Sequence, residues 1–282
     1  MKRIILSALA ALACLTSISA APKSGDQDVK ITVMSYNIRN GEAKDGTNSW
    51  QFRAGASVEM LKDQSPDIFG VQEAYEYQVR LLTEYPGTYK SVGVGREDGK
   101  KEGEFMSIFY KKSMFKVLKW GTFWLSDTPE KPSLGWDAAC RRTATWALLK
   151  HKKSGKKFFY VNTHLDHVGW EARRKGLALI VDRIQSINPK GLPMVLTGDF
   201  NMTPDRPEFS DLNKRMLSAR ETAPITDHHS TFHDWGKQDK DIIDYIYYSN
   251  FSRCEKFETV TKGYLERKFV SDHYPVKAVL VF

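Results

Sequence analysis

The chain has 282 residues, and its 42 lysines and arginines against 34 aspartates and glutamates give a formal net charge of +8. This length suits one large α/β domain, and the mildly basic charge is compatible with an anionic substrate without requiring one. Three cysteines are too few for a disulfide scaffold, and the spacing of Cys140 and Cys254 fits no zinc knuckle.

The first twenty residues predict a secretory signal peptide. Lys2 and Arg3 precede an apolar run that is too short to span a membrane and that ends in small residues. Cleavage near Ala20 would release a soluble protein and would remove two positive charges, lowering +8 to +6. The stretch "ALAC" ending at Cys14 resembles a lipoprotein-type signal, which would leave a lipid anchor instead. A buried N-terminal helix is the remaining alternative.

The rest of the chain, residues 28–282, is expected to form one domain that is secreted or periplasmic and monomeric. No second long apolar run follows the first, so no transmembrane helix is expected. Strands are predicted from β-branched, alternating or short buried runs, at residues 28–38, 68–74, 105–112, 115–125, 142–150, 157–165, 192–199, 241–249 and 274–282. Helical spacing of apolar residues predicts helices at 50–67 and 170–187, and a polar irregular stretch occupies 201–240. This order predicts a mixed α/β sandwich with partly antiparallel sheets.

One hairpin gives a more detailed expectation. If "KKSG" forms its turn, Thr143 faces His164 and Arg142 sits beside Leu165. Strands rise about 3.3 Å per residue, so the turn would lie roughly 20 Å from His164. Arg142 and His164 would then share one end of the sheet. We interpret the lysines of the turn as solvated rather than as a binding patch: Lys152, Lys153, Lys156 and Lys157.

Polar residues stand repeatedly where an apolar strand ends, and such residues often converge on one rim of a sheet. Carboxylate and amide oxygens suit a hard cation such as Mg²⁺, and histidines among acids suit proton transfer or charge stabilisation. With an arginine, this is the chemistry that phosphoryl or phosphodiester hydrolysis needs. The residues concerned are Asn37, Glu73, His164, Asp166, Asp199, Asn201, Asp244, Asp272 and His273.

Six pieces of the chain resemble the endonuclease/exonuclease/phosphatase (DNase I-like) superfamily. They are "MSYNIRNG", "VQEA", "VNTHLDH", "LTGDFNMTP", "TFHDWG" with "IIDYIYYS", and "SDHYPV". They occur in the family's order and span residues 31–282, so the sequence looks like a secreted bacterial member. The resemblance implies a DNase I-like four-layer sandwich, in which two mostly antiparallel mixed sheets are flanked by helices.

The resemblance also implies a metal site and a catalytic centre. Glu73 would be the principal ligand of Mg²⁺, or alternatively Mn²⁺, with Asn37 supporting the metal or its water and Asp272 beside it. Asp199 would orient or deprotonate the attacking water, and Asn201 and Arg142 would bind the phosphate. His273 would contact the scissile phosphate while Asp244 holds its ring. His164 would stabilise the transition state or assist the leaving group.

Several residues keep two interpretations. Asp166 and His167 are either structural or on the substrate side of the site. Trp124, in an aromatic segment with Trp120, Phe123 and Trp136, either forms a substrate-binding wall or packs in the core. The histidines at 228, 229 and 233 favour a polar loop over a zinc site.

The sequence therefore predicts a metal-dependent phosphoester hydrolase of a phosphodiester or a small phosphorylated molecule. One alternative is a nonspecific extracellular nuclease, with nucleic acid as its partner. A noncatalytic binding module on the same fold is the other. Modest net charge and the absence of a basic stripe that can be placed at the site weigh against the nuclease.

Overall fold

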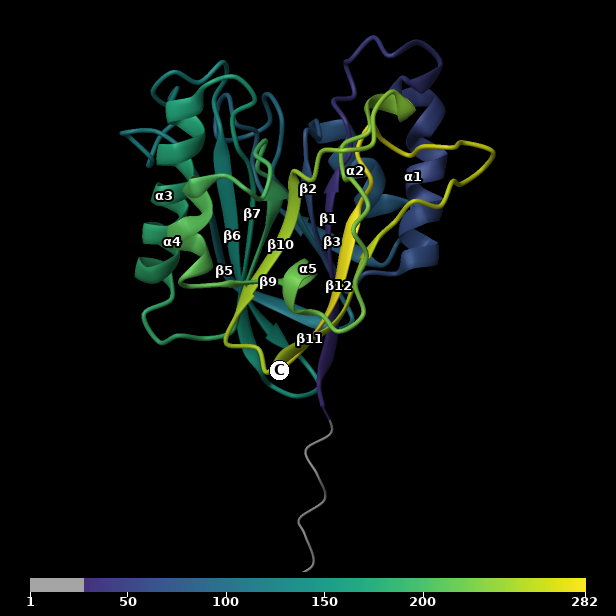
Figure 1. The fold of residues 1–282 in the computed structure, drawn as a ribbon. Coiled ribbons are helices and arrows are strands. Elements are labelled where there is room, and N and C mark those ends of the chain that lie inside the picture. The colour runs from purple at the N-terminus through teal and green to yellow at the C-terminus, as the bar shows by residue number, and fades with distance from the viewer. Residues whose placement is uncertain (1–27) are drawn as a thin grey trace, which may run out of the picture.

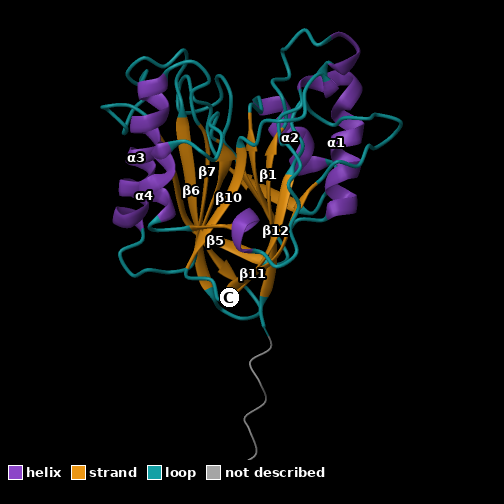
Figure 2. Ribbon diagram, viewed as in Figure 1, coloured by secondary structure: helices purple, strands orange, loops and turns teal. Residues whose placement is uncertain are grey.

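Two six-stranded β-sheets pack face to face, with helices on both outer faces, as Figures 1 and 2 show. The computed structural model describes residues 28–282, so the predicted signal peptide and Cys14 lie outside the described residues. This arrangement confirms the predicted four-layer sandwich of two mixed sheets flanked by helices.

The first sheet, called here the β1 sheet, joins the two ends of the domain. Its central strand β1 pairs in parallel with β2 and antiparallel with β12, so the first and last strands of the fold are neighbours. Every residue of β2 is buried, as expected for a strand covered on both faces. The strand order is β11 (Arg253–Thr259), β12 (Val276–Val281), β1 (Lys30–Asn37), β2 (Ile68–Gln72), β4 (Ile108–Lys111) and β3 (Tyr89–Val92).

The second sheet, the β7 sheet, is antiparallel except for the parallel pair β7 and β8. Its hairpin has the predicted register, because Ala144 pairs with Thr163 and Lys150 pairs with Lys157. The lysine turn therefore lies at the end of the sheet opposite His164. The strand order is β5 (Phe115–Trp124), β6 (Thr143–His151), β7 (Lys157–His164), β8 (Met194–Asp199), β10 (Asp244–Ser249) and β9 (Leu217–Ser218).

Helices cover the outer face of each sheet. α1 (Trp50–Gln64) and α2 (Glu76–Glu84) pack on the β1 sheet through a cluster that includes Met60, Leu61 and Leu82. α3 (Trp170–Ile187) and α4 (Ser210–Asn213) cover the β7 sheet through Leu177, Ile180 and Leu212. Within residues 28–282, no helix combines the length and the hydropathy that crossing a bilayer requires.

Six helices and strands were not predicted from the sequence: α2, β3, β11 and three short elements, α4, β9 and α5 (Ala219–Thr222). The stretch 201–240 was expected to be irregular. It holds α4, β9, α5 and the 3₁₀ turns Pro207–Phe209 and Asp234–Gly236. Cys140 and Cys254 are free thiols, not a disulfide.

A buried asparagine ties the two sheets together. Asn162 of β7 donates from Nδ2 to the carbonyl oxygens of Val71 (2.7 Å) and Ser107 (3.2 Å) in the β1 sheet. Its Oδ1 accepts from Gln72 Nε2 at 2.7 Å and from Thr197 Oγ1 at 3.1 Å. All four hydrogen-bonding positions of this fully buried amide are therefore occupied.

Replacing Asn162 by leucine should lower the free energy of unfolding by about 3 kcal/mol or more, because it strands several buried polar partners. Urea unfolding followed by circular dichroism would show a lower midpoint with an unchanged slope. Asn213→Leu is the matched control, because Asn213 is exposed on α4. Equal midpoints for the two variants would contradict the assignment of a stabilising role to this amide.

Candidate active site

The candidate residues meet because of strand direction. Asn37 ends β1, His164 ends β7 and Asp199 ends β8. Asp244 begins β10, which runs antiparallel to β8, so it reaches the same edge. Within the β7 sheet, His164 and Asp244 are the two register partners of Asp199, which aligns the three side chains in one row.

Several residues at this edge have left-handed backbone conformations, among them Glu73 and Asn201. Glu73, directly after β2, has φ 64°, and Asn201, two residues after β8, has φ 49°. Asparagine tolerates this region, but glutamate rarely adopts it, and such strain costs about 1–3 kcal/mol. It persists at Glu73 because both carboxylate oxygens are bound: Oε1 accepts from Asn37 Nδ2 at 3.0 Å, and Oε2 accepts from the Asn40 amide at 2.7 Å.

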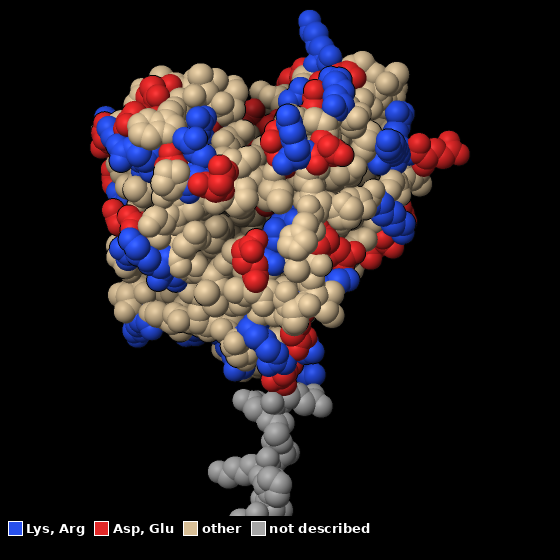
Figure 3. All heavy atoms as spheres, in the orientation of Figure 1, with Lys and Arg blue, Asp and Glu red and all other residues tan. Residues whose placement is uncertain are grey.

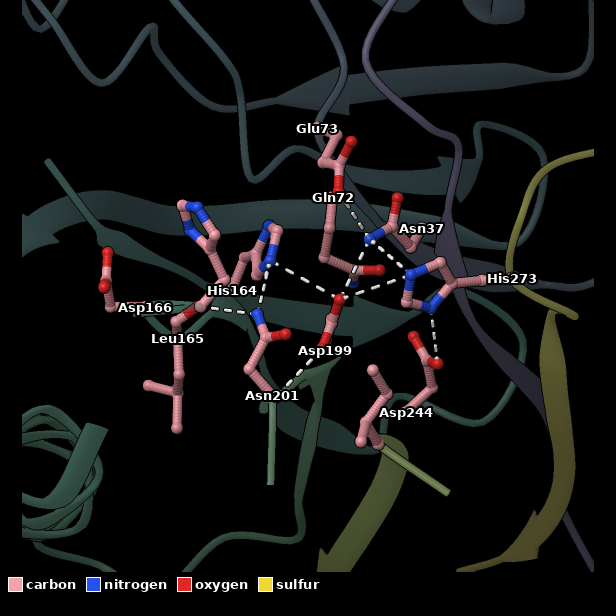
Figure 4. A network of polar contacts seen from close by, with 12 residues as sticks. Asn37, Gln72, Glu73, His164, Leu165, Asp166, Asp199, Asn201, Asp244 and His273 are labelled. Atoms are coloured by element: carbon pink, nitrogen blue, oxygen red, sulfur yellow. Dashed lines mark hydrogen bonds and ion pairs between the residues drawn. The ribbon is translucent and has the colours of Figure 1, made fainter. Parts of the chain in front are cut away.

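Asn37 connects the acidic groups of the two sheets, as Figure 4 shows. Besides Glu73, its Nδ2 donates to Asp199 Oδ2 at 2.9 Å and lies 3.5 Å from His273 Nε2. Its Oδ1 accepts from the Arg39 amide at 3.0 Å. One amide side chain thus fixes a carboxylate of the β1 sheet relative to a carboxylate of the β7 sheet.

His273 forms a buried pair with Asp244, since its Nδ1 lies 2.8 Å from Asp244 Oδ2. Burial by itself would lower the pKa of the imidazole. The charge and hydrogen bond of Asp244, together with the charge of Asp199, outweigh burial and raise the pKa of His273 to about 10. A positively charged ring at the floor of the site is suited to contact an anion.

His164 has the opposite electrostatic environment. Burial and the neighbouring Arg142 hold the pKa of His164 well below its usual range, so this ring is neutral. Its Nε2 lies 3.0 Å from Asn201 Nδ2 and 3.4 Å from Asp199 Oδ2. The two histidines therefore flank Asp199 with different charges.

The acidic groups of the site fit a hard divalent cation. Burial and the nearby Asp244 raise the pKa of Asp199. Burial and the negative charge of Glu73 raise the pKa of Asp272. Such crowding of carboxylates is unfavourable without a cation. The ligand atoms of Glu73, His164 and Asp199 lie within 4.8 Å of one another. Oxygen donors dominate the set, which is the preference of Mg²⁺ or Mn²⁺.

These side chains line a cavity of about 640 Å³. The surface is hollowed at the upper edge of Figure 3, between the two halves of the molecule. Asn37 and Asp244 lie behind the cavity wall. Of the predicted residues, those that line the cavity are Glu73, Arg142, His164, Asp199, Asn201, Asp272 and His273.

Asp166 and Trp124 were predicted to contact substrate, but neither lines the cavity. The Asp166 carboxylate accepts from the backbone amides of Ala139, Val168 and Gly169 and lies 3.3 Å from Arg142 Nε. It therefore holds Arg142, in keeping with the structural interpretation.

Trp124 is buried, and its Nε1 donates to the carbonyl oxygen of Arg96 at 2.7 Å. The edge of the ring also lies against Gly99, so Trp124 supports the loop that carries Arg96 and Gly99 from behind the cavity wall. Stacking of a substrate on this tryptophan is thus not what the geometry favours.

His233 is a packed histidine rather than a zinc ligand. Its ring packs against Phe269 and Tyr274, and its Nδ1 accepts from the Gly236 amide. His228 and His229 are exposed. No cluster of three possible ligands in residues 28–282 includes any of these histidines.

Several cavity residues were missed, among them Arg39, Asn40, Arg96 and Glu104. Arg39 and Asn40 stand two and three positions after Asn37 in "MSYNIRNG", so the motif itself carried a signal for them. Arg39 Nη1 lies 3.4 Å from Asp272 Oδ2. Arg96 and Glu104 lie in a stretch rich in glycine and charge, which resembles a solvated turn, so no sequence pattern indicated them.

Comparisons with known proteins agree with the motifs. A sequence model of the "Endonuclease/Exonuclease/phosphatase family" matches residues 34–273. The chain is similar to an endonuclease/exonuclease/phosphatase from Bacteroides vulgatus, with 36% identity, a TM-score of 0.84, and coverage of 89% of this chain and 98% of that one. A family protein from Bacteroides thetaiotaomicron has 32% identity to this chain and a TM-score of 0.86, and the match covers 91% of this chain and 99% of that one. A mannosyl-6-phosphatase from that organism has 32% identity to this chain and a TM-score of 0.84, and the match covers 89% of this chain and 100% of that one. The chain therefore belongs to the endonuclease/exonuclease/phosphatase family.

Proposed function

We propose that this protein is a divalent-metal-dependent hydrolase of small phosphorylated molecules. Family members act on phosphoester bonds, which gives the reaction class. The observation that carries the proposal is the convergence of Glu73, Asp199, Asn201, His164 and His273 on one bounded polar cavity. The similarity to a mannosyl-6-phosphatase over 89% of this chain supports a compact substrate.

Glu73 and Asp272, supported by Asn37, would hold the cation, for which we propose Mg²⁺. When bound, such an ion neutralises charge on the phosphate oxygens and makes a water molecule easier to deprotonate. Asn37 keeps Glu73 in position by donating to its Oε1, and the Asn40 amide fixes Oε2.

Asp199 would orient the attacking water and take its proton. Asn37 Nδ2 binds its Oδ2 at 2.9 Å and the Asn201 amide binds its Oδ1 at 2.9 Å, so the carboxylate cannot rotate freely. The water oxygen forms a bond to phosphorus as the ester bond on the opposite side breaks, and the proton of the water passes to Asp199.

Asn201, His164 and the positively charged His273 then provide contacts for the phosphate oxygens. Charge develops on these oxygens and on the leaving oxygen in the transition state, so fixed donors around them lower the barrier. His164 and Arg142 lie on the same side of the cavity, which we assign to the leaving group.

Two observations favour a small molecule over nucleic acid. Lysines and arginines are interspersed with acidic residues on the face shown in Figure 3, without one continuous basic surface. A nuclease of polymeric DNA needs such a surface to neutralise many phosphates. A bounded cavity of about 640 Å³ also suits a compact ligand.

A substrate panel tests the proposal. The purified protein would be assayed with sugar phosphates, inositol phosphates, a diaryl phosphodiester, sphingomyelin, DNA and RNA, each with Mg²⁺, Mn²⁺ or EDTA. We expect turnover of a small phosphate ester that EDTA abolishes and added Mg²⁺ restores. Preferred cleavage of DNA or RNA, or turnover that survives EDTA, would refute it.

The predicted signal at residues 1–20 supports the further proposal that the protein acts outside the cytoplasm. Metabolic labelling with a radioactive fatty acid, comparing wild type with Cys14→Ser, separates the two forms. Label that depends on Cys14 indicates a lipid anchor, and unlabelled protein in the soluble fraction indicates cleavage near Ala20.

A further inference from the structure

A second polar surface lines the cavity beside the proposed metal site. It consists of Asn40, Arg96 and Glu104 and is called here the Glu104 wall. None of its side chains has a role in the chemistry proposed above. Glu104 is 6% exposed, so a buried carboxylate faces a cavity without serving the reaction.

The Glu104 wall adjoins Glu73 through Asn40. The Asn40 amide binds Glu73 Oε2, and the Asn40 side chain donates from Nδ2 to Glu104 Oε1 at 3.1 Å. Arg96 Nη1 donates to the other oxygen, Glu104 Oε2, at 2.5 Å. A molecule whose phosphate lies at Glu73 would therefore have the rest of its structure within reach of this wall.

The loop that carries Arg96 and Glu104 is held in place. The Arg96 amide donates to the Glu104 carbonyl oxygen at 3.0 Å, so the two residues face each other across a hairpin. The Phe105 amide donates to the Ala74 carbonyl oxygen at 2.7 Å, beside Glu73. Trp124 secures the Arg96 carbonyl oxygen from behind. A wall fixed in this way binds a ligand at a reduced entropic cost.

The charges of the wall indicate what it binds. Glu104 is paired with Arg96, Arg96 Nε also contacts Glu97, and the nearby Arg142 is paired with Asp166. Little net charge is left to attract a second anion. Hydroxyl groups fit better, because each can donate to a carboxylate and accept from a guanidinium. Arg96 Nη2 makes no hydrogen bond to the described part of the chain and can serve as such a donor.

We propose that the Glu104 wall binds the hydroxyl groups of the substrate's alcohol part, so that the enzyme selects a polyhydroxylated phosphate monoester such as a hexose phosphate. The inference rests on the proposed function, which places the phosphate beside Glu73. A site built to bind hydroxyl groups discriminates strongly against ligands that lack them, because its polar groups are then left unpaired. The competing explanation is that Glu104 merely positions Glu73 through Asn40.

Binding to an inactive variant separates these explanations. In an Asp199→Asn background with Mg²⁺, calorimetry would give Kd for mannose 6-phosphate and for n-hexyl phosphate, which has the same carbon number without ring hydroxyls. Adding Glu104→Gln should raise the Kd for mannose 6-phosphate at least about tenfold and change the Kd for hexyl phosphate less than about threefold. Arg96→Lys, which keeps the charge and loses the fork, should reproduce this pattern if Glu104→Gln does not fold.

Glu102→Gln is the matched control, because Glu102 lies in the same loop with an exposed side chain. It should leave both values of Kd unchanged. Equal weakening of both ligands by Glu104→Gln would show that Glu104 positions Glu73 and would overturn the inference. No weakening of the sugar phosphate would also overturn it.

Kinetics of the wild type distinguish failure of this inference from failure of the proposed function. Hydrolysis of hexyl phosphate as efficient as that of mannose 6-phosphate would leave the proposed function in place and overturn the role of the wall. Selective binding of the sugar phosphate with no hydrolysis under any metal condition would overturn the proposed function and leave the role of the wall standing.

Discussion

Asp199→Asn should lower kcat by about 10³-fold or more, because it removes both the base for the attacking water and a fixed charge. The amide has nearly the same shape, and its oxygen can still accept from the Asn201 backbone, although its NH2 group cannot accept from Asn37 Nδ2. Stability should be unchanged or increased, since burial and the adjacent Asp244 disfavour the carboxylate form. Steady-state kinetics and thermal unfolding measure the two effects.

Asp205→Asn is the control for this substitution, as Asp205 is exposed six residues along the same loop. It should leave kcat and the unfolding temperature unchanged. If Asp199→Asn kept kcat within tenfold of the wild type, another group would have to activate the water.

The second large effect is expected at His273. His273→Gln should lower kcat by about 10²–10⁴-fold, because a buried cation facing the phosphate is lost. Asp199 also loses a neighbouring positive charge, which raises the pKa of its carboxyl further. His229→Gln makes the same change at an exposed position and should leave kcat unchanged. Activity of His273→Gln close to that of His229→Gln would exclude a direct role for this ring.

Asp244→Asn tests whether the charge of His273 matters, since Asp244 holds the ring and also raises its pKa to about 10 from an ordinary 6.5. Without the Asp244 charge the folded-state pKa falls toward 6.5. His273 would then lose its proton as pH rises between these two values, where the wild type keeps it. We expect the rate of Asp244→Asn, relative to wild type, to decline as pH rises through this window. A constant ratio across the window would mean that the neutral ring is sufficient.

The fold was predictable where side-chain periodicity was strong. The β-branched run of β1 and the helical spacing of α3 both produced the predicted elements. α2 was missed because it begins after Tyr75, which is not a usual capping residue, and follows a buried strand without a clear loop. β11 was missed because charged residues alternate along an edge strand of the sheet.

The site was predictable where motif residues end strands, as with Asn37 and Asp199. The positions of the site residues across the two sheets were not predictable, because they depend on sheet packing rather than on local sequence. Asn162 looks like an ordinary polar residue within a strand, yet it connects both sheets. Arg96 and Glu104 face the cavity only because Trp124 and Ala74 hold their loop.

The pairing of β1 with β12 has a consequence for when the protein becomes active during synthesis. Asn37 emerges from the ribosome well before His273 and β12, because 236 positions separate Asn37 from His273 along the chain. A nascent chain therefore carries an incomplete centre until β12 is available to pair with β1. Contacts between such distant segments form slowly, because a long intervening chain must first be ordered. Hydrolytic activity should thus appear only after β12 has been synthesised and has paired with β1.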